Sequence, residues 1–302
     1  MKTLLTHNST FHADDVFAVA TFLLAHSEEK WKIVRSRDKV EIESADAVID
    51  VGDVYNPVEL RFDHHQSGGA GVRPNGIPYA SFGLVWKEYG ALVCGGDFFV
   101  AKQIEDALVC SLDANDNGVK IVDPLFDVSQ FDLSTYVKVR NLTWKEEVEY
   151  GDKAEAKRLE AFLSLVDFAS SLINREIKRY KDKNDAFEIV NKAYEEAEDK
   201  RLVVLNNFYP WQDAVMAHNE PLFVVYPTDL SLDKWAIKSV PVSKNSFESR
   251  KSFPKDWAGK RDSDLEVATG VKGALFCHNA GFLVVVQGFE SAMTIAKKAL
   301  SA

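Results

Sequence analysis

The sequence predicts an α/β protein of two lobes, of which the first carries a parallel sheet. Short β-like runs alternate with helical patterns from the N-terminus to Gly118, an order typical of βαβ units. Between Trp144 and Arg201, apolar residues recur at helical spacing among charged ones. After Arg201 the short β-like runs return. Together these observations predict a first α/β lobe, long connecting helices and a second, smaller α/β lobe.

The first lobe is expected to span residues 1–140. Its β-like runs cover residues 3–6, 32–35, 45–51 and 61–62. Its helical patterns cover residues 14–25, 79–89 and 98–112. In the first of these helices the apolar spacing turns one face inward, formed by Val16, Phe17, Ala20, Leu23 and Leu24.

The connector is expected over residues 141–205, as one long helix followed by a second that starts near Asn184. Residues 206–302 then form the second lobe. Its expected strands lie at residues 222–226, 234–240, 274–278 and 282–287, and its expected helices at 262–269 and 289–300. The charged runs of the connector are interpreted as solvated helix faces.

Composition excludes several classes of protein. The chain has 302 residues, 46% hydrophobic and 27% charged, which excludes a disordered or fibrous chain. Its net charge of −10, without an obvious basic stripe, argues against a partner of long duplex nucleic acid. No apolar run approaches the roughly 18–20 residues of a membrane helix. Asp14 and Asp15 interrupt the apolar stretch that a signal peptide would need. The three cysteines, Cys94, Cys110 and Cys277, form no CxxC pair, which suits a reducing compartment. We therefore expect a soluble cytoplasmic protein.

Histidine and aspartate residues gather at the predicted strand ends of the first lobe. Such ends line the ligand crevice of open α/β sheets. Asp50 follows the third strand, and two aspartates follow the last helix of this lobe in a turn marked by Asn-Gly. The potential metal ligands are His7, His12, Asp14, Asp50, His64 and one of Asp113 or Asp116. Mixed histidine and carboxylate ligands suit Mn²⁺, Zn²⁺, Fe²⁺ or Co²⁺, and this number fits two metal ions.

The motifs resemble the four-part signature of the DHH phosphoesterase superfamily. A closer likeness is to the Myg family, sometimes labelled metal-dependent protein hydrolase. In the first lobe the resemblance rests on THNSTFHADDVFA (6–18), VIDVGDVYNP (48–57), RFDHHQ (61–66), SFGLVWKEYG (81–90) and LDANDNGV (112–119). In the second lobe it rests on KWAIKSVP (234–241), WAGKRDSDL (257–265) and GALFCHNAGF (273–282).

This resemblance implies a DHH-type catalytic domain and a metal-dependent phosphodiesterase, associated in the family with 3′–5′ exonuclease activity on RNA. Two divalent ions, Mn²⁺ first and Zn²⁺, Co²⁺ or Mg²⁺ otherwise, would supply a bound hydroxide. By the superfamily pattern Asp50 bridges the metals, His65 faces the substrate phosphate and Asp63 supports the histidines. Asp116 is favoured over Asp113 because Asp-Asn-Gly is similar to the usual Asp-x-Gly turn.

In the second lobe the resemblance implies contacts to the substrate, for which the candidates are His278, Arg261, Arg250 and Lys238. Here the chain has Leu-Val-Val-Val-Gln after Phe282, where the family tends to be glycine-rich. The expected substrate is a short RNA or nucleotide-like phosphodiester in the cleft between the lobes. Hydrolysis of pyrophosphate or of an amide, and a non-catalytic metal-binding protein, are the alternatives. The oligomeric state is left open, a homodimer being one option.

Overall fold

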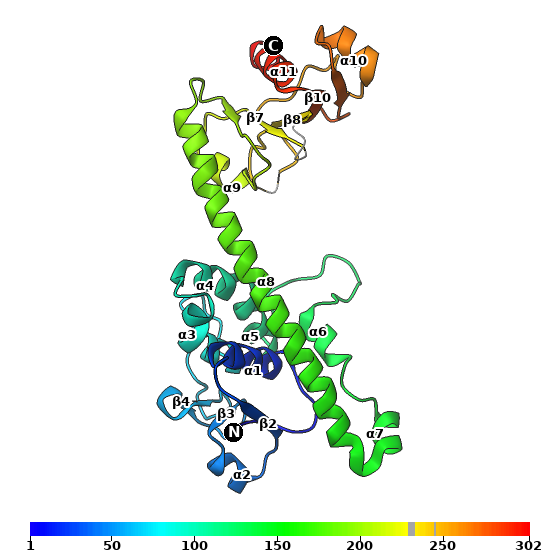
Figure 1. The fold of residues 1–302 in the computed structure, drawn as a ribbon. Helices are drawn as coiled ribbons and strands as arrows, with labels where there is room; N and C mark the ends of the chain where they lie inside the picture. Colours follow the sequence, from blue (N-terminus) through cyan, green and yellow to red (C-terminus); the bar gives the residue numbers. More distant parts are fainter. Residues whose placement is uncertain (229–232, 245) are drawn as a thin grey trace. The chain divides into compact units, whose positions relative to one another are not determined.

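The computed structural model describes residues 1–228, 233–244 and 246–302, and it divides into two compact units (Figure 1). The first unit spans Met1–Lys181 and the second spans Asp182–Ala302. Each unit contains one five-stranded sheet with helices around it. The division falls inside the connector expected at residues 141–205.

The first sheet has the strand order β2-β1-β3-β5-β4. Its strands are β1 (Lys2–Thr6), β2 (Trp31–Arg35), β3 (Ala47–Ile49), β4 (Tyr55–Asn56) and β5 (Arg61–Phe62). The pairs β1/β2, β1/β3 and β3/β5 are parallel, which confirms the predicted parallel arrangement of these four strands. The edge strand β4 was not predicted, and it pairs antiparallel to β5, so the sheet is mixed.

The third strand is shorter than the predicted run of residues 45–51. A short helix, α2 (Lys39–Ser44), precedes β3, and Ala45 is its C-terminal cap, so Ala45 is not part of the strand. A one-turn helix, η1 (Pro57–Glu59), follows β4. At the other end Asp50 has a φ of 59° and leaves the extended region. An aspartate tolerates this left-handed conformation better than a β-branched residue does. The strand therefore ends where the backbone turns the Asp50 side chain away from the sheet.

Two helices, α1 (Ala13–Ala25) and α3 (Ser81–Val93), form the core of the first unit with the sheet. Every residue of α1 from Ala13 to Phe22 is buried, because the helix lies between the sheet and other helices. The rings of Phe17 and Phe82 lie 5.5 Å apart in this core. The predicted start of α1 is confirmed to within one residue, whereas α3 begins at Ser81 and not at residue 79.

The next helical region differs from the prediction in a way that matters for the site. Instead of ending at residue 112, it runs through α4 (Phe98–Ile104), a π-helical turn (Glu105–Val109) and α5 (Cys110–Asp116). Asp113 and Asp116 thus belong to the helix, and the prediction that they follow it is wrong. They stand three residues apart and share one helix face.

The connector contains one very long helix. After α6 (Leu133–Lys138), α7 (Trp144–Tyr150) and a 3₁₀ turn (Gly151–Lys153), α8 runs from Ala154 to Glu196, 43 residues. The predicted break near Asn184 is wrong, because no glycine or proline interrupts these residues. Within the described part of the chain, none of the helices is apolar over enough length to cross a bilayer.

The second unit has a sheet of order β6-β7-β8-β10-β9. Its strands are β6 (Leu202–Val204), β7 (Phe223–Pro227), β8 (Lys234–Ser239), β9 (Ala274–Cys277) and β10 (Leu283–Gln287). The last four confirm the predicted strands; β6, three residues long, lay inside the predicted helical connector. Among its helices are α9 (Gln212–Met216), α10 (Asp262–Thr269) and α11 (Phe289–Ser301). The sheet is antiparallel except for the β6/β7 pair.

Candidate metal centre

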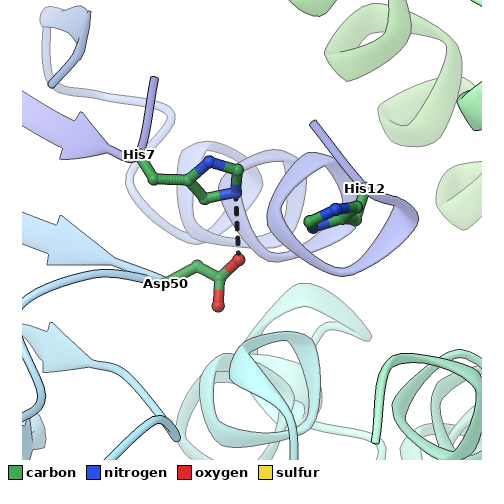
Figure 2. Close-up of side chains that lie close together, drawn as sticks. All are labelled: His7, His12 and Asp50. Atoms are coloured by element: carbon green, nitrogen blue, oxygen red, sulfur yellow. Dashed lines mark ion pairs between the residues drawn. The ribbon is translucent and has the colours of Figure 1, made fainter. Parts of the chain in front are cut away.

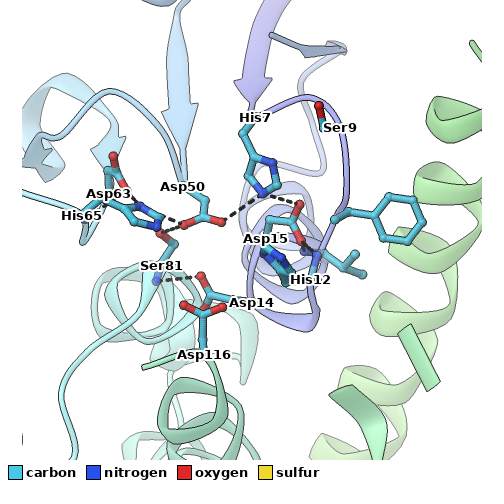
Figure 3. A network of polar contacts seen from close by, with 12 residues as sticks. His7, Ser9, His12, Asp14, Asp15, Asp50, Asp63, His65, Ser81 and Asp116 are labelled. Atoms are coloured by element: carbon cyan, nitrogen blue, oxygen red, sulfur yellow. Dashed lines mark hydrogen bonds and ion pairs between the residues drawn. The ribbon is translucent and has the colours of Figure 1, made fainter. Parts of the chain in front are cut away.

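Histidines and aspartates meet at the carboxyl edge of the first sheet (Figure 3). His7 follows β1, Asp50 follows β3, and Asp63, His64 and His65 follow β5. These strands are parallel neighbours, so their ends lie at one edge. Helices complete the cluster with the aspartates of α1 and α5, which are Asp14, Asp15 and Asp116.

Asp50 lies at the middle of this cluster, with less than a twentieth of its surface exposed. Its Oδ2 lies 3.3 Å from His7 Nε2 (Figure 2). Its Oδ1 lies 3.4 Å from His64 Nε2. The Ser81 hydroxyl also donates to Oδ1, at 2.9 Å. The two carboxylate oxygens therefore face different histidines, which is the arrangement a bridging ligand needs.

Three overlapping groups of side chains could each hold a metal ion, since their ligand atoms lie within 4.8 Å of one another. The groups are His7, His12 and Asp50; then Asp50, His64 and His65; then Asp14, His64 and Asp116. The structure thus brings together six of the seven residues expected as ligands. Asp113 lies outside these groups.

The buried nitrogen atoms of His7 and His64 indicate that the cluster fits a cation. Both Nε2 atoms are buried and make no hydrogen bond, although carboxylate oxygens lie 3.1–3.4 Å away. Asp15 Oδ2 is likewise buried without a hydrogen-bond partner among the described residues. Ligand atoms bound to one ion at about 2.1 Å lie about 3.0–3.4 Å apart, so these separations match the edges of a coordination shell. Buried polar atoms without a partner are otherwise costly.

The tautomer of His7 is set by the next residue. His7 Nδ1 lies 3.0 Å from the main-chain carbonyl oxygen of Asn8. Because a carbonyl oxygen only accepts, Nδ1 keeps its proton, so the proton that a metal displaces is the one on Nε2. The same carbonyl accepts from Arg37 Nη1 at 2.6 Å. A backbone group thus ties a metal-facing histidine to a neighbouring arginine.

The start of α3 holds the second carboxylate of the centre. Asp14 accepts from the amide of Ser81 at 2.9 Å and from that of Phe82 at 2.8 Å. Burial and the neighbouring Asp50 and Asp116 nevertheless raise the pKa of Asp14 well above its usual range, with His64 opposing them. The like charges around Asp14 therefore make a bound cation strongly favourable.

Asp113 has a different set of partners. Its Oδ2 lies 2.7 Å from Arg73 Nη2, and its Oδ1 accepts from the amide of Gly83 at 3.0 Å. Arg73 also pairs with Glu105 and lies over the Tyr79 ring. Asp113 thus anchors α3 and Arg73, while Asp116 lies 3.2 Å from His64 Nε2.

His65 is the more open of the two histidines that follow β5, with its side chain 55% exposed. Its Nδ1 lies 2.7 Å from Asp63 Oδ1. The hydrogen bond to Asp63 raises the pKa of His65, and partial burial opposes this. Asp63 is itself fixed by the amides of Asp53 and His64. Nε2 of His65 is consequently free to meet a ligand from the open side.

Three polar residues of the centre were not assigned from the sequence. Asp15 lies 3.1 Å from His7 and accepts from the amide of His12; Ser81 and Arg73 hold Asp50 and Asp113. Asp15 and Ser81 lie in the stretches that carry the family resemblance, which was the available signal. Arg73 lies in a glycine-rich loop that carried none.

The candidates of the second unit have diverse surroundings. The exposed Arg261 packs over the ring of Phe276, and Lys238 lies near the rings of Trp211 and Phe282. His278 lies beside Phe282 and accepts from the amide of Ala280. Arg250 instead donates to two carbonyl oxygens, those of His218 and Pro221. The first three share an aromatic neighbourhood, and Arg250 has a role in holding a loop.

The fold and the cluster define an α/β protein with a candidate metal centre of the hydrolase type. Residues 3–300 match the family model MYG1_exonuc, described as Uncharacterised protein family (UPF0160). The chain belongs to this family, which confirms the resemblance seen in the sequence.

Relatives from distant organisms extend over nearly the whole chain. The "MYG1 protein" of Chlamydia pneumoniae is 30% identical over 96% of this chain and 93% of its own length. The "MYG1 protein" of Dictyostelium discoideum is 29% identical over 99% and 96%. The "MYG1 exonuclease" of Homo sapiens is 29% identical over 98% and 85%. The predicted class, an enzyme of nuclease type, is confirmed by these family and relative names.

Metal loading should release protons. Burial lowers the pKa of both histidines, but the carboxylates outweigh it, raising the pKa of His7 to about 10 and that of His64 to about 11. The metal-free protein therefore holds both protons at pH 8, and a cation must displace them. Titrating Mn²⁺ into weakly buffered protein should release protons, and affinity should rise by about tenfold per released proton for each pH unit. A titration without proton release would contradict this.

Gly83→Ala should destabilise the protein, although alanine is the better helix former. A Cβ atom at this position would lie 1.9 Å from Asp113 Oδ2 and 2.4 Å from Arg73 Nη2. Helix propensity alone predicts a gain of about 0.5–1 kcal/mol, whereas displacing a buried ion pair predicts a loss of about 3 kcal/mol or more. Urea unfolding of the variant and the wild type gives the change in the free energy of unfolding, and its sign decides between the two effects. A stabilised variant would show that the Asp113–Arg73 pair can move aside without loss of stability.

Proposed function

We propose that this protein is a metal-dependent phosphodiesterase that acts as a 3′–5′ exonuclease on short RNA, with a dinuclear metal centre. The observation that carries the proposal is Asp50, whose two oxygens face the buried Nε2 atoms of His7 and His64, neither of which has a hydrogen-bond partner in the part of the chain that the structure describes. Two relatives named "MYG1 exonuclease", from Homo sapiens and Mus musculus, support the nuclease class.

The ligands divide into two sets that share Asp50. One set is His7 and His12 with Asp50, joined at its edge by Asp15. The other is Asp14, His64 and Asp116, also within reach of Asp50. Mixed nitrogen and carboxylate ligands favour Mn²⁺, with Zn²⁺, Co²⁺ or Mg²⁺ as other occupants. Asp113, paired with Arg73, is assigned a supporting role.

The bound cations would acidify a water molecule and offset the charge of the phosphate. The protein's own contribution is positional. Asp63 holds His65 through Nδ1, so Nε2 can donate to a non-bridging oxygen of the phosphate. The hydrogen bond to Asp63 raises the pKa of His65, which favours the protonated ring that can donate from Nε2. Ser81 and the amides of α3 fix the carboxylates that would hold the metals.

The substrate class follows from charge and from the second unit. A chain of net charge −10 suits short single strands better than long duplexes. Arg261 and Lys238 combine cationic groups with aromatic neighbours, and the His278 ring lies beside Phe282, which suits contacts to phosphates and bases. We assign these three residues to substrate selection. Arg250 is assigned a structural role, because it donates to carbonyl oxygens of a loop.

The direct test is turnover of an end-labelled RNA of a few nucleotides with increasing Mn²⁺. The proposal expects metal-dependent shortening from the 3′ end and mononucleotide products. Asp50→Asn should lose turnover together with part of the bound metal. Normal rates and two bound metals in Asp50→Asn would show that Asp50 is not the bridging ligand.

His64→Ala and His65→Ala should fail in different ways. His64 is placed as a ligand, so its loss should lower metal content. His65 is placed toward the phosphate, so its loss should keep most of the metal and cost on the order of 10²–10³ in rate. Metal analysis of both purified variants beside their rates makes the comparison. Equal metal loss in the two would remove the distinction between neighbouring histidines.

Arg261→Ala should leave metal binding intact and weaken turnover of oligonucleotides more than that of a small chromogenic diester. Remote contacts position a long substrate, and a small diester does not reach them. Lys255→Ala, an exposed lysine of the same unit, is the matched control. The same loss on both substrates, or none on either, would take Arg261 out of the binding surface.

A further inference from the structure

Two cavities of the first unit meet at the metal centre. The first, about 760 Å³, is lined by Asp50, Asp63 and His65 on one side. The second, about 520 Å³, is lined by His12, Asp14 and Asp116 and also by His65. Sites for small ligands usually have volumes of about 300–1,000 Å³. Each cavity is large enough for one nucleotide, and His65 lines both.

The first cavity contains two cations that the proposed chemistry does not use. Arg37 and Lys39 line it, and both are exposed. Arg37 is held in place, because Nη1 donates to the carbonyl oxygen of Asn8 at 2.6 Å and lies 3.2 Å from the Asn8 side-chain oxygen. In the described part of the chain, no carboxylate forms an ion pair with Arg37 or Lys39. Their positive charges are therefore available to an anion.

The other charges of this cavity limit where an anion could bind. The Arg61 guanidinium donates to main-chain carbonyl oxygens, those of Ala45 and Glu59 among them. Glu43, Asp53 and Glu59 also line the cavity and would repel a phosphate. Arg37 and Lys39, two residues apart at the entry to α2, are thus the place where a phosphate meets unpaired positive charge.

We propose that Arg37 and Lys39 form a second phosphate subsite, which binds the phosphate next to the scissile one in the chain of the substrate. This inference rests on the proposed phosphodiesterase activity. The carbonyl of Asn8 joins the two places, because it accepts from both Arg37 and His7. Arg37 is therefore linked through one backbone group to a histidine of the metal cluster, and it lines the same cavity as Asp50 and His65. Arginine suits this task because its planar fork can bind two phosphate oxygens.

The subsite makes the enzyme sensitive to a terminal phosphate on its smallest substrates. The diribonucleotide ApA has one diester and no neighbouring phosphate, whereas pApA carries one on the 5′ side and ApAp one on the 3′ side. The wild-type protein with Mn²⁺ should cleave pApA or ApAp with a kcat/KM about 10–100-fold above that for ApA. Charge-assisted hydrogen bonds to one phosphate are of this strength.

Variants of Arg37 test whether this preference comes from the proposed place. Arg37→Gln should lower kcat/KM for the preferred phosphorylated substrate at least tenfold more than for ApA. Arg37→Lys should retain part of the preference, since it keeps the charge and loses the fork. Lys39→Gln should show a smaller loss of the same kind. Arg175→Gln, an exposed arginine of α8 that lines neither cavity, is the charge-matched control and should keep the wild-type preference.

The outcomes separate the subsite from the activity on which it rests. A wild-type protein that cleaves ApA as fast as both phosphorylated forms overturns the subsite, and so does an equal loss on all three substrates in Arg37→Gln. If none of the dinucleotides is cleaved, the phosphodiesterase proposal fails. Equilibrium binding of pApA, ApAp and ApA to the wild type and to Arg37→Gln, without turnover, then still tests the subsite. Equal affinities of the wild type for all three would overturn it.

Discussion

Repulsion between buried carboxylates is the interaction on which the first unit depends. Asp14, Asp15, Asp50, Asp63 and Asp113 are all buried near one edge of the sheet. Ionised groups of one sign resist being placed together in a medium of low polarity. Imidazole rings, one guanidinium group and several main-chain amides compensate the negative charge of these carboxylates through ion pairs and hydrogen bonds. In the absence of metal, protons on His7 and His64 supply the positive charge that cations would supply otherwise.

This constraint explains details of the fold that have no local cause. Asp50 adopts a left-handed backbone conformation, which costs energy and turns its carboxylate into the cluster. Gly83 stands where a side chain would collide with the Asp113–Arg73 pair. The π-helical turn before α5 changes the helical register just ahead of Asp113 and Asp116, and such turns often mark functional sites. Each feature places one charge where another compensates it.

The sequence predicted the parallel strands and most of the ligands, because strand periodicity and strand-end placement are local properties. Asp50 and His64 follow parallel strands and lie where this reasoning expected them to meet. The predicted break near Asn184 was wrong, because residues 154–196 contain no glycine or proline and form one helix. Asp113 and Asp116 could not be separated from sequence spacing. Their difference depends on Arg73, which is 40 residues from Asp113 in the chain and contacts it only in the folded protein.

The helix α3 begins without a cap of its own, as Ala80 precedes it and offers no side-chain acceptor. Its first amides are satisfied by Asp14 of α1 and Asp113 of α5, which are 67 and 30 residues away from their partners. Helix nucleation is unfavourable, and contacts between distant residues form slowly. The start of α3 therefore cannot become ordered until segments from three parts of the chain have come together. Ordering of the first turn of α3 and assembly of the charged cluster are then one event, so a substitution in the cluster would disturb this helix along with the chemistry.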